Sequence, residues 1–230
     1  MKRMRLVEIE HVIIEEVEKP VPQKDEVLIK VAMVGVCGTD IHAYYGRHPY
    51  IKCPIVLGHE FSGIVESTGE GVEGIKTGSK VTVIPHLGCG KCEPCLNKEY
   101  NRCEELKCIG CQATGAYAEY ITVPAKVVVP MPESMSFEQG AFVEPASVAY
   151  HGVKRGMKPG DIALIMGAGP IGIMAMQFAK ELGAKMAVIA DFKQNRLDLA
   201  KALGADGIIN LNNEALECGL ERILGSPKKV

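Results

Sequence analysis

Four cysteines lie close together and follow the spacing C-x2-C-x2-C-x7-C: Cys89, Cys92, Cys95 and Cys103. Such short gaps let the backbone fold back so that four thiolates surround one tetrahedral zinc ion. A disulfide network and an iron–sulfur cluster are weaker interpretations, because a cluster would favour a closing C-x3-C-P element that this segment lacks. Four protein ligands leave no position for a substrate, so the spacing predicts a structural zinc site.

A second set of metal-binding residue types is spread more widely along the chain. Cys37 and His59 offer a thiolate and an imidazole, and Glu60 and Glu144 are candidate carboxylate ligands. Three protein ligands and one open position make a catalytic zinc site. Taken singly, Cys37 and His59 also fit a buried cysteine and a core histidine. The residue types alone leave both Glu60 and Glu144 as candidates for the third ligand.

A glycine-rich turn with the pattern G-x-G-x-x-G follows the apolar residues 162–166 and precedes an amphipathic stretch that ends at Leu182. In this context the first glycine permits a sharp turn, the second admits a pyrophosphate, and the third lets a helix pack closely on a strand. Glycines also serve ordinary strand-to-helix turns. The pattern predicts a dinucleotide site at Gly167, Gly169, Pro170, Ile171 and Gly172.

Asp191 supports the dinucleotide prediction because it follows Gly172 by nineteen residues, at the end of the apolar segment 186–190. A carboxylate there accepts hydrogen bonds from the ribose 2′-hydroxyl and repels a 2′-phosphate. We therefore expect NAD, with NADP less favoured although Lys193 and Arg196 lie nearby; Arg196 is included in the predicted cofactor site. The alternative is that Asp191 only caps a helix.

Length and composition predict a globular chain of mixed α/β type. The 230 residues are 47% hydrophobic and 23% charged, and the net charge of −2 argues against nucleic-acid or anionic-membrane partners. Residues 162–179 carry no charged side chain, but glycines and a proline interrupt them, so we expect a buried strand, turn and helix rather than a membrane span. The nine cysteines and the absence of an export signal pattern predict a cytoplasmic protein.

The secondary-structure pattern changes along the chain. The first 130 residues predict strands over residues 5–17, 26–36, 61–68, 80–84 and 117–129, and from about Phe137 to Asn210 helices alternate with strands as in a parallel sheet. We expect a boundary near Tyr150, inside or beside a helix that begins around Glu144, and hence domains of residues 1–149 and 150–230. Residues 211–230 carry no clear strand pattern.

Several motifs in one order connect these observations. Cys37 opens a C-G-T-D-x-H element, Gly58 opens GHE-xx-G-x5-G-xx-V, and the four cysteines, a Glu144-Pro145 pair and the dinucleotide turn follow. Together they resemble the zinc-dependent medium-chain alcohol dehydrogenase family from about residue 5 to residue 210. Glu144, where many alcohol dehydrogenases have cysteine, is most similar to the polyol (sorbitol) and threonine dehydrogenase branch.

The resemblance implies a mainly β GroES-like catalytic domain and a Rossmann-type domain. It implies hydride transfer between NAD and a secondary alcohol of the polyol or sugar-alcohol type. Cys37, His59, Glu60 and Glu144 would serve the catalytic zinc, and Thr39 and His42 would relay the alcohol proton. It also implies a homo-oligomer for a full-length member. The alternative is a non-catalytic zinc-binding remnant or interaction module.

Two features depart from the family pattern. Family members continue beyond residue 230, and a complete dinucleotide fold has two βαβαβ halves whereas this sequence has room for one, so we expect a truncated Rossmann-type domain. Cys108 and Cys111 form a further C-x-x-C pair outside the matched motifs. Inert buried thiols are the simplest interpretation of that pair.

Overall fold

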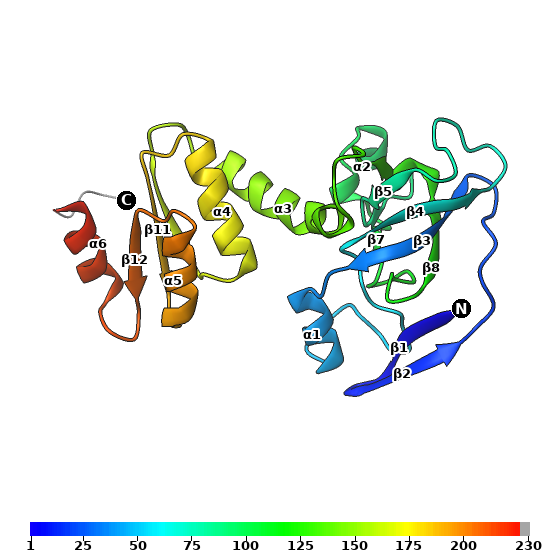
Figure 1. Ribbon diagram of the computed structural model, residues 1–230, viewed down its shortest axis with the longest axis horizontal. Coiled ribbons are helices and arrows are strands. Elements are labelled where there is room, and N and C mark those ends of the chain that lie inside the picture. The colour runs from blue at the N-terminus through cyan, green and yellow to red at the C-terminus, as the bar shows by residue number, and fades with distance from the viewer. Residues whose placement is uncertain (226–230) are drawn as a thin grey trace. The chain divides into compact units, whose positions relative to one another are not determined.

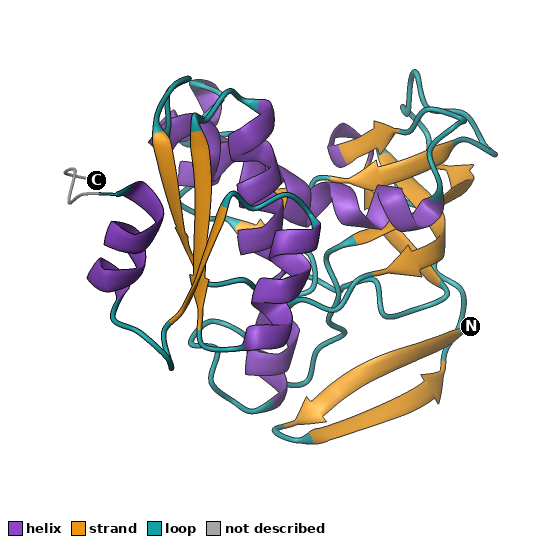
Figure 2. Cartoon of the chain, turned by 60° about the vertical axis from the view of Figure 1, so that its left-hand side comes forward, coloured by secondary structure: helices purple, strands orange, loops and turns teal. Residues whose placement is uncertain are grey.

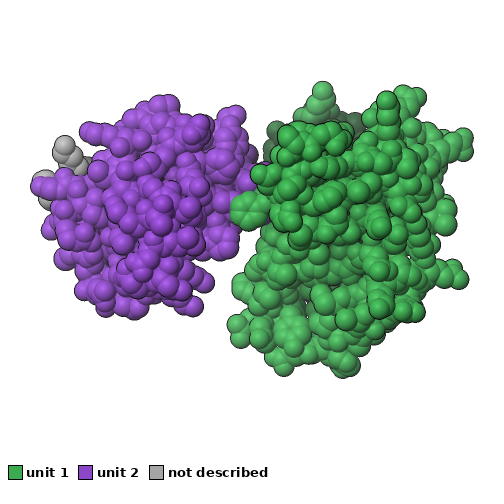
Figure 3. All heavy atoms as spheres, viewed as in Figure 1, with its two compact units in different colours: residues 1–144 green, residues 145–230 purple. Residues whose placement is uncertain are grey.

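The computed structural model describes residues 1–225 and divides the chain into two compact units, Met1–Glu144 and Pro145–Val230 (Figure 3). The division falls inside helix α3 (Phe137–Gly156), which contains Pro145. The last five residues of the predicted domain 150–230 lie outside the described residues. The assignment of catalysis to residues 1–149 and of cofactor binding to residues 150–230 stays a prediction.

The first unit is built on a five-stranded antiparallel sheet in the order β8-β3-β4-β5-β9 (Figure 1). Its strands are β3 (Glu26–Val34), β4 (Phe61–Thr68), β5 (Lys80–Val83), β8 (Tyr120–Pro124) and β9 (Val128–Pro130). Strands distant in sequence pair here, since β3 lies between β4 and β8. The predicted β-rich architecture of this half is confirmed.

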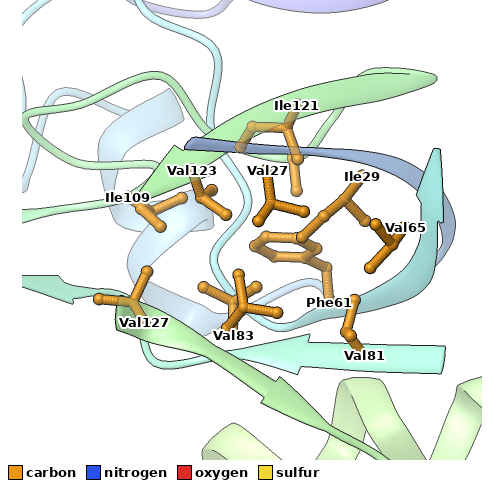
Figure 4. Close-up of a cluster of buried hydrophobic side chains, with 12 residues drawn as sticks. Val27, Ile29, Phe61, Val65, Val81, Val83, Ile109, Ile121, Val123 and Val127 are labelled. Atoms are coloured by element: carbon orange, nitrogen blue, oxygen red, sulfur yellow. The ribbon is translucent and has the colours of Figure 1, made fainter. Parts of the chain in front are cut away.

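The core of this sheet gathers around Phe61, which is 1% exposed (Figure 4). Val27 and Ile29 contribute from β3, because alternate residues of a strand point to the same face. Val81 and Val83 of β5 follow the same alternation. The buried face explains why β-branched residues recur at every second position of these segments.

Two predicted strands are interrupted in the structure. Residues 5–17 form a hairpin of β1 (Lys2–Glu8) and β2 (His11–Glu16), because the chain turns at Glu10, whose φ is 60°. Residues 117–129 form β8 and β9, separated by the short helix η2 (Ala125–Val127) after Pro124. The predictions of single strands were therefore wrong, since alternation does not reveal an interruption of only two or three residues.

Short elements complete the first unit. Helix α1 (Gly38–Tyr44) follows β3, and helix α2 (Glu93–Leu96) and the 3-10 helix η1 (Tyr100–Arg102) lie in the four-cysteine segment. Strands β6 (His86–Leu87) and β7 (Lys107–Cys108) flank that segment and pair with each other. Together they bring the ends of the cysteine segment side by side.

Helix α3 begins at Phe137 rather than around Glu144, so the predicted start was wrong. A capping box explains the earlier start: the Gln139 backbone N–H donates to the Ser136 hydroxyl, and the Ser136 N–H donates to the Gln139 side-chain oxygen. These bonds satisfy two of the free amides at the helix start.

The second unit contains the parallel sheet β10-β11-β12, formed by β10 (Ile162–Met166), β11 (Met186–Asp191) and β12 (Gly207–Asn210). Helices α4 (Pro170–Glu181), α5 (Gln194–Ala202) and α6 (Leu216–Leu224) surround the strands (Figure 2). Alternate β11 residues face opposite sides: Ala187 and Ile189 pack with α4 and α5, whereas Val188 packs on the α6 side. This doubly covered parallel sheet confirms the predicted Rossmann-type architecture.

No helix within residues 1–225 has the length and apolar character needed to cross a membrane. The uncharged run 162–179 consists of β10, the glycine-rich turn and most of α4.

Candidate metal and cofactor sites

The four-cysteine segment forms one compact thiol cluster. The Sγ atoms of Cys89, Cys92, Cys95 and Cys103 all lie within 4.8 Å of one another. The Cys89 and Cys95 sulfurs are 4.0 Å apart, and those of Cys92 and Cys103 are 3.9 Å apart. Tetrahedral zinc with bonds of about 2.3 Å requires sulfurs roughly 3.8 Å apart. The cluster therefore fits the predicted zinc site.

The backbone prepares this cluster for thiolates. The N–H of Cys89 donates to the Cys103 sulfur at 3.2 Å, and the N–H of Cys92 donates to the Cys89 sulfur at 3.4 Å. Hydrogen bonds from the backbone of Lys91 and Cys92 lower the pKa of Cys89 to about 6. Amide donors of this kind stabilise thiolate charge, which favours metal binding over neutral thiols.

A second cluster joins Cys37, His59 and Glu60, whose ligand atoms also lie within 4.8 Å of one another. Cys37 is the N-cap of α1, and His59 and Glu60 immediately precede β4. His59 is 7% exposed, and its Nδ1 atom is buried without a hydrogen-bond partner among residues 1–225. A buried imidazole beside a thiol and a carboxylate is a donor set that fits a metal ion.

Asp40 holds this cluster together, and sequence reasoning missed it. Its carboxylate accepts the backbone N–H of Cys37 at 2.9 Å, the N–H of Gly58 at 3.3 Å and the hydroxyl of Tyr117 at 3.0 Å. It also lies 3.9 Å from His59 Nδ1. One buried carboxylate thus orients both chain segments that carry the ligand candidates. The signal was present, because Asp40 occupies the fourth position of the C-G-T-D-x-H element.

Glu144 belongs to the electrostatic environment of the same cluster. Burial raises the pKa of the Glu144 carboxyl; the charge of His59 opposes this rise and that of Glu60 adds to it. Among the described residues, the compact ligand group contains Glu60 and not Glu144. Glu60 thus lies in the position of a third ligand, and Glu144 is near enough to influence it.

Thr39 and His42 lie on α1, three residues apart and therefore on one side of the helix. Thr39 is half-buried and His42 is exposed. The pair thus leads from the helix start next to Cys37 outward to solvent. This placement is compatible with the predicted relay, whose role stays a prediction.

The pKa of His59 leads to a testable pH dependence of metal uptake. Burial lowers this pKa, but the interaction with Cys37 and the charges of Asp40, Cys37 and Cys111 outweigh burial and raise it to about 9. Zinc requires the neutral imidazole, so binding must displace a proton below that pH. The apparent zinc affinity of this site should rise about tenfold per pH unit up to about pH 9 from His59 alone. Competition with a chromophoric chelator measures this slope, and an affinity that stays constant across neutral pH would contradict it.

The glycine-rich turn has the geometry expected for a dinucleotide site. Gly167 has a φ of +99° and its N–H donates to the Ala190 carbonyl at 2.7 Å. A Cβ atom on Gly172 would lie 1.8 Å from the Gly167 carbonyl oxygen, so only glycine permits this approach. Gly169 is the N-cap of α4, Pro170 is its first residue and Ile171 is 42% exposed. Free helix-start amides at such a turn bind phosphate.

Asp191 connects the end of β11 to this turn. Its carboxylate accepts the N–H of Lys193 and the N–H of Ala168, both at 2.7 Å. Arg196 lies 3.8 Å away. These backbone hydrogen bonds keep the pKa of Asp191 low, and the one from Lys193 has the largest effect. Burial opposes them. The N-cap of α5 is Lys193, so Asp191 is not the cap residue itself and retains lone pairs for a ribose.

Two family models match the chain. The alcohol dehydrogenase GroES-like domain matches residues 23–133, and the zinc-binding dehydrogenase model matches residues 170–224. Sorbitol dehydrogenase of Bacillus subtilis is 40% identical over 206 residues, which cover 86% of this chain and 58% of that protein. L-threonine 3-dehydrogenase of the same bacterium is 40% identical over 202 residues and covers the same shares.

A solved structure agrees with these sequence matches. The rspB alcohol dehydrogenase of Escherichia coli CFT073, complexed with NADH, superposes with a TM-score of 0.90 at 36% identity and covers 96% of this chain and 66% of that one. The chain spans less than two thirds of the length of these relatives. Both family models agree with the order of the motifs and with the β-rich and Rossmann-type units. The chain belongs to the zinc-dependent medium-chain alcohol dehydrogenase family.

Proposed function

We propose that the protein is a zinc-dependent dehydrogenase that transfers a hydride between a secondary alcohol, of the polyol or sugar-alcohol type, and NAD. The observation that carries this proposal is the group of Cys37, His59 and Glu60, whose ligand atoms all lie within 4.8 Å of one another and whose imidazole is buried. Three donors from a rigid helix start and a strand start support an open metal site, because they leave a position for substrate.

Different residues of the chain would have different roles at the metal site. Bound zinc would act as a Lewis acid toward the substrate hydroxyl. Cys37, His59 and Glu60 would hold the metal, and Asp40 would orient the first two by accepting the N–H groups of Cys37 and Gly58. Glu144, whose pKa is raised by burial, would exchange with Glu60 or hold a water.

The alcohol proton needs a path to solvent. We assign this path to Thr39 and His42, because they share one side of α1 and their exposure increases from the first to the second. An imidazole can accept a proton at one ring nitrogen and release one from the other. His42→Ala should therefore slow turnover, measured as the rate of NAD reduction, while the zinc content stays unchanged.

For the cofactor, the turn Gly167–Gly172 would bind the pyrophosphate and Asp191 the ribose. Asp191→Ala should weaken NAD binding roughly tenfold or more, since a hydrogen bond to a charged group is lost. NADP binding should weaken less, because the carboxylate no longer repels the 2′-phosphate. Fluorescence titration with both cofactors measures the effect, with Asp198→Ala on the exposed face of α5 as the control. Equal losses for both cofactors would contradict the assignment.

NAD reduction with a panel of polyols, sugar alcohols and their phosphates tests the proposed function. Turnover should require zinc and disappear when a chelator removes it. A folded, zinc-loaded protein that oxidises no secondary alcohol would instead support the alternative of a non-catalytic zinc-binding module. The relatives act on a polyol and on an amino acid by their names, so the panel should include threonine.

We further propose a cytoplasmic location and a homo-oligomer, with small-molecule alcohols as the partners. The chain has nine cysteines, eight of them in the first unit, and free thiols suit a reducing compartment. Light scattering on the zinc-loaded protein tests the oligomeric state.

A further inference from the structure

Cys108 and Cys111 occupy the two ends of a tight turn outside both zinc clusters. The N–H of Cys111 donates to the Cys108 carbonyl at 3.0 Å, and Gly110 has a φ of +76°. A turn closed in this way keeps its end Cα atoms within about 7 Å of each other. A disulfide requires Cα atoms about 4.4–6.8 Å apart. The backbone therefore already holds the two cysteines near the separation of a disulfide.

The turn packs against the loop that carries His59. A Cβ atom on Gly110 would lie 2.7 Å from the Gly58 carbonyl oxygen, and the N–H of Ala116 donates to that same oxygen at 2.9 Å. The N–H of Tyr117 donates to the Leu57 carbonyl at 3.0 Å. Any shift of the turn is thus transmitted to the residues immediately before His59.

A basic pocket is lined by one of the two cysteines. It has a volume of about 540 Å³, and Cys111 lines it together with Arg3, Arg5 and Lys52. Arg3 and Arg5 share a single carboxylate, that of Glu15. Three cationic side chains against one carboxylate leave an excess of positive charge in the pocket. Such a pocket attracts a small anionic molecule.

We propose that Cys108 and Cys111 are a reversible redox pair that an anionic low-molecular-weight disulfide oxidises from the basic pocket, and that the resulting bond alters the loop carrying His59. The inference goes beyond the proposed dehydrogenase activity and does not depend on it. Inert thiols explain neither the turn geometry nor the cationic lining. Within residues 1–225 the pair also belongs to no group of metal-ligand atoms.

The exchange is balanced in two steps. The Cys111 thiolate attacks one sulfur of the small disulfide, which breaks that S–S bond, forms a mixed disulfide and releases the first small thiolate. The Cys108 thiolate then attacks the Cys111 sulfur and releases the second small thiolate. The two protons lost by the protein thiols go through solvent to the leaving thiolates. The small disulfide is reduced by two electrons, and the cysteine pair is oxidised by two.

Glutathione disulfide is the probe for the test, applied to the reduced, zinc-loaded protein. Trypsin releases residues 108–126 as one peptide, which contains Cys108 and Cys111 and no other cysteine. This peptide should become lighter by two hydrogen atoms. Cys108→Ser should instead accumulate a mixed disulfide at Cys111, and Cys111→Ser should react slowly at Cys108. A native peptide that stays reduced, or one that carries only mixed disulfides, would overturn the redox pair.

The basic pocket is tested by comparing charged and neutral oxidants. Lys52→Gln should slow oxidation by glutathione disulfide roughly two- to fivefold, and added salt should have a similar effect. Oxidation by the uncharged hydroxyethyl disulfide should be unaffected by either change. Equal sensitivity to the two oxidants would refute the assignment of the pocket.

The coupling to the metal site has its own measurement. Oxidised protein should release zinc to a chelator at a different rate from reduced protein, and the difference should vanish in the Cys108→Ser, Cys111→Ser double variant. Identical rates for oxidised and reduced protein would refute the coupling. Mass and zinc release are independent of turnover, so a failure here is distinct from a failure of the proposed dehydrogenase activity.

Discussion

His59→Ala should remove one of the two bound zinc ions and reduce alcohol oxidation by at least about a thousandfold. His59 supplies the only imidazole of the Cys37–His59–Glu60 group, and its side chain is buried. Without it, a thiol and a carboxylate remain, which is too few ligands for a catalytic zinc site. The structural zinc should stay, because its four cysteines lie in a separate cluster.

Metal analysis and kinetics on the same preparation measure this result. His59→Gln is the second variant, since it keeps the buried volume and should lose the zinc without a large cavity penalty. His11→Ala is the matched control, because its side chain is 56% exposed and pairs with the surface carboxylate of Glu8. Full zinc content in both His59 variants would remove the basis of the proposed function.

Cys95→Ser should empty the other zinc site and loosen the cysteine segment. Cys95 is buried at 4% exposure, and a serine hydroxyl does not deprotonate readily enough to replace a thiolate ligand. The segment has little apolar core of its own, since Leu96 is 70% and Tyr100 is 51% exposed. Structural zinc contributes on the order of 10 kcal/mol to the folding of comparable small motifs. Residues 89–103 should therefore lose most of their folded structure when the metal is absent.

Limited trypsin digestion and zinc analysis measure the effect. Cleavage after Lys98 or Arg102 should become fast in Cys95→Ser, while the His59 site should retain its zinc. The exposed Cys218 provides the control, and Cys218→Ser should keep both zinc ions and the native digestion rate. Loss of zinc from both sites in Cys95→Ser would mean that the two clusters are not independent. Together with His59→Ala, this variant assigns each zinc ion to its own cluster.

Elements with strong local signals were predictable from sequence. The strand Phe61–Thr68 has the predicted bounds, and the turn after Met166 has the predicted glycine geometry, because both depend on neighbouring residues. The start of α3 was misplaced because the capping box at Ser136, which sets the start, was not recognised in the sequence. The turn at Glu10 was missed since a charged residue carries no clear turn signal.

The sequence by itself determined the ligand types and the compact four-cysteine cluster, because gaps of two residues keep the thiolates close enough to bind one metal ion. It also determined the order of the motifs, and through them the family. Only the tertiary structure decided that Glu60 joins Cys37 and His59 in one group, and that Asp40 binds both segments. It alone placed the Cys108–Cys111 turn against Gly58 and beside a basic pocket. Such contacts depend on how β3, β4 and β8 pair. The spacing of neighbouring residues in the sequence does not reveal which distant strands pair.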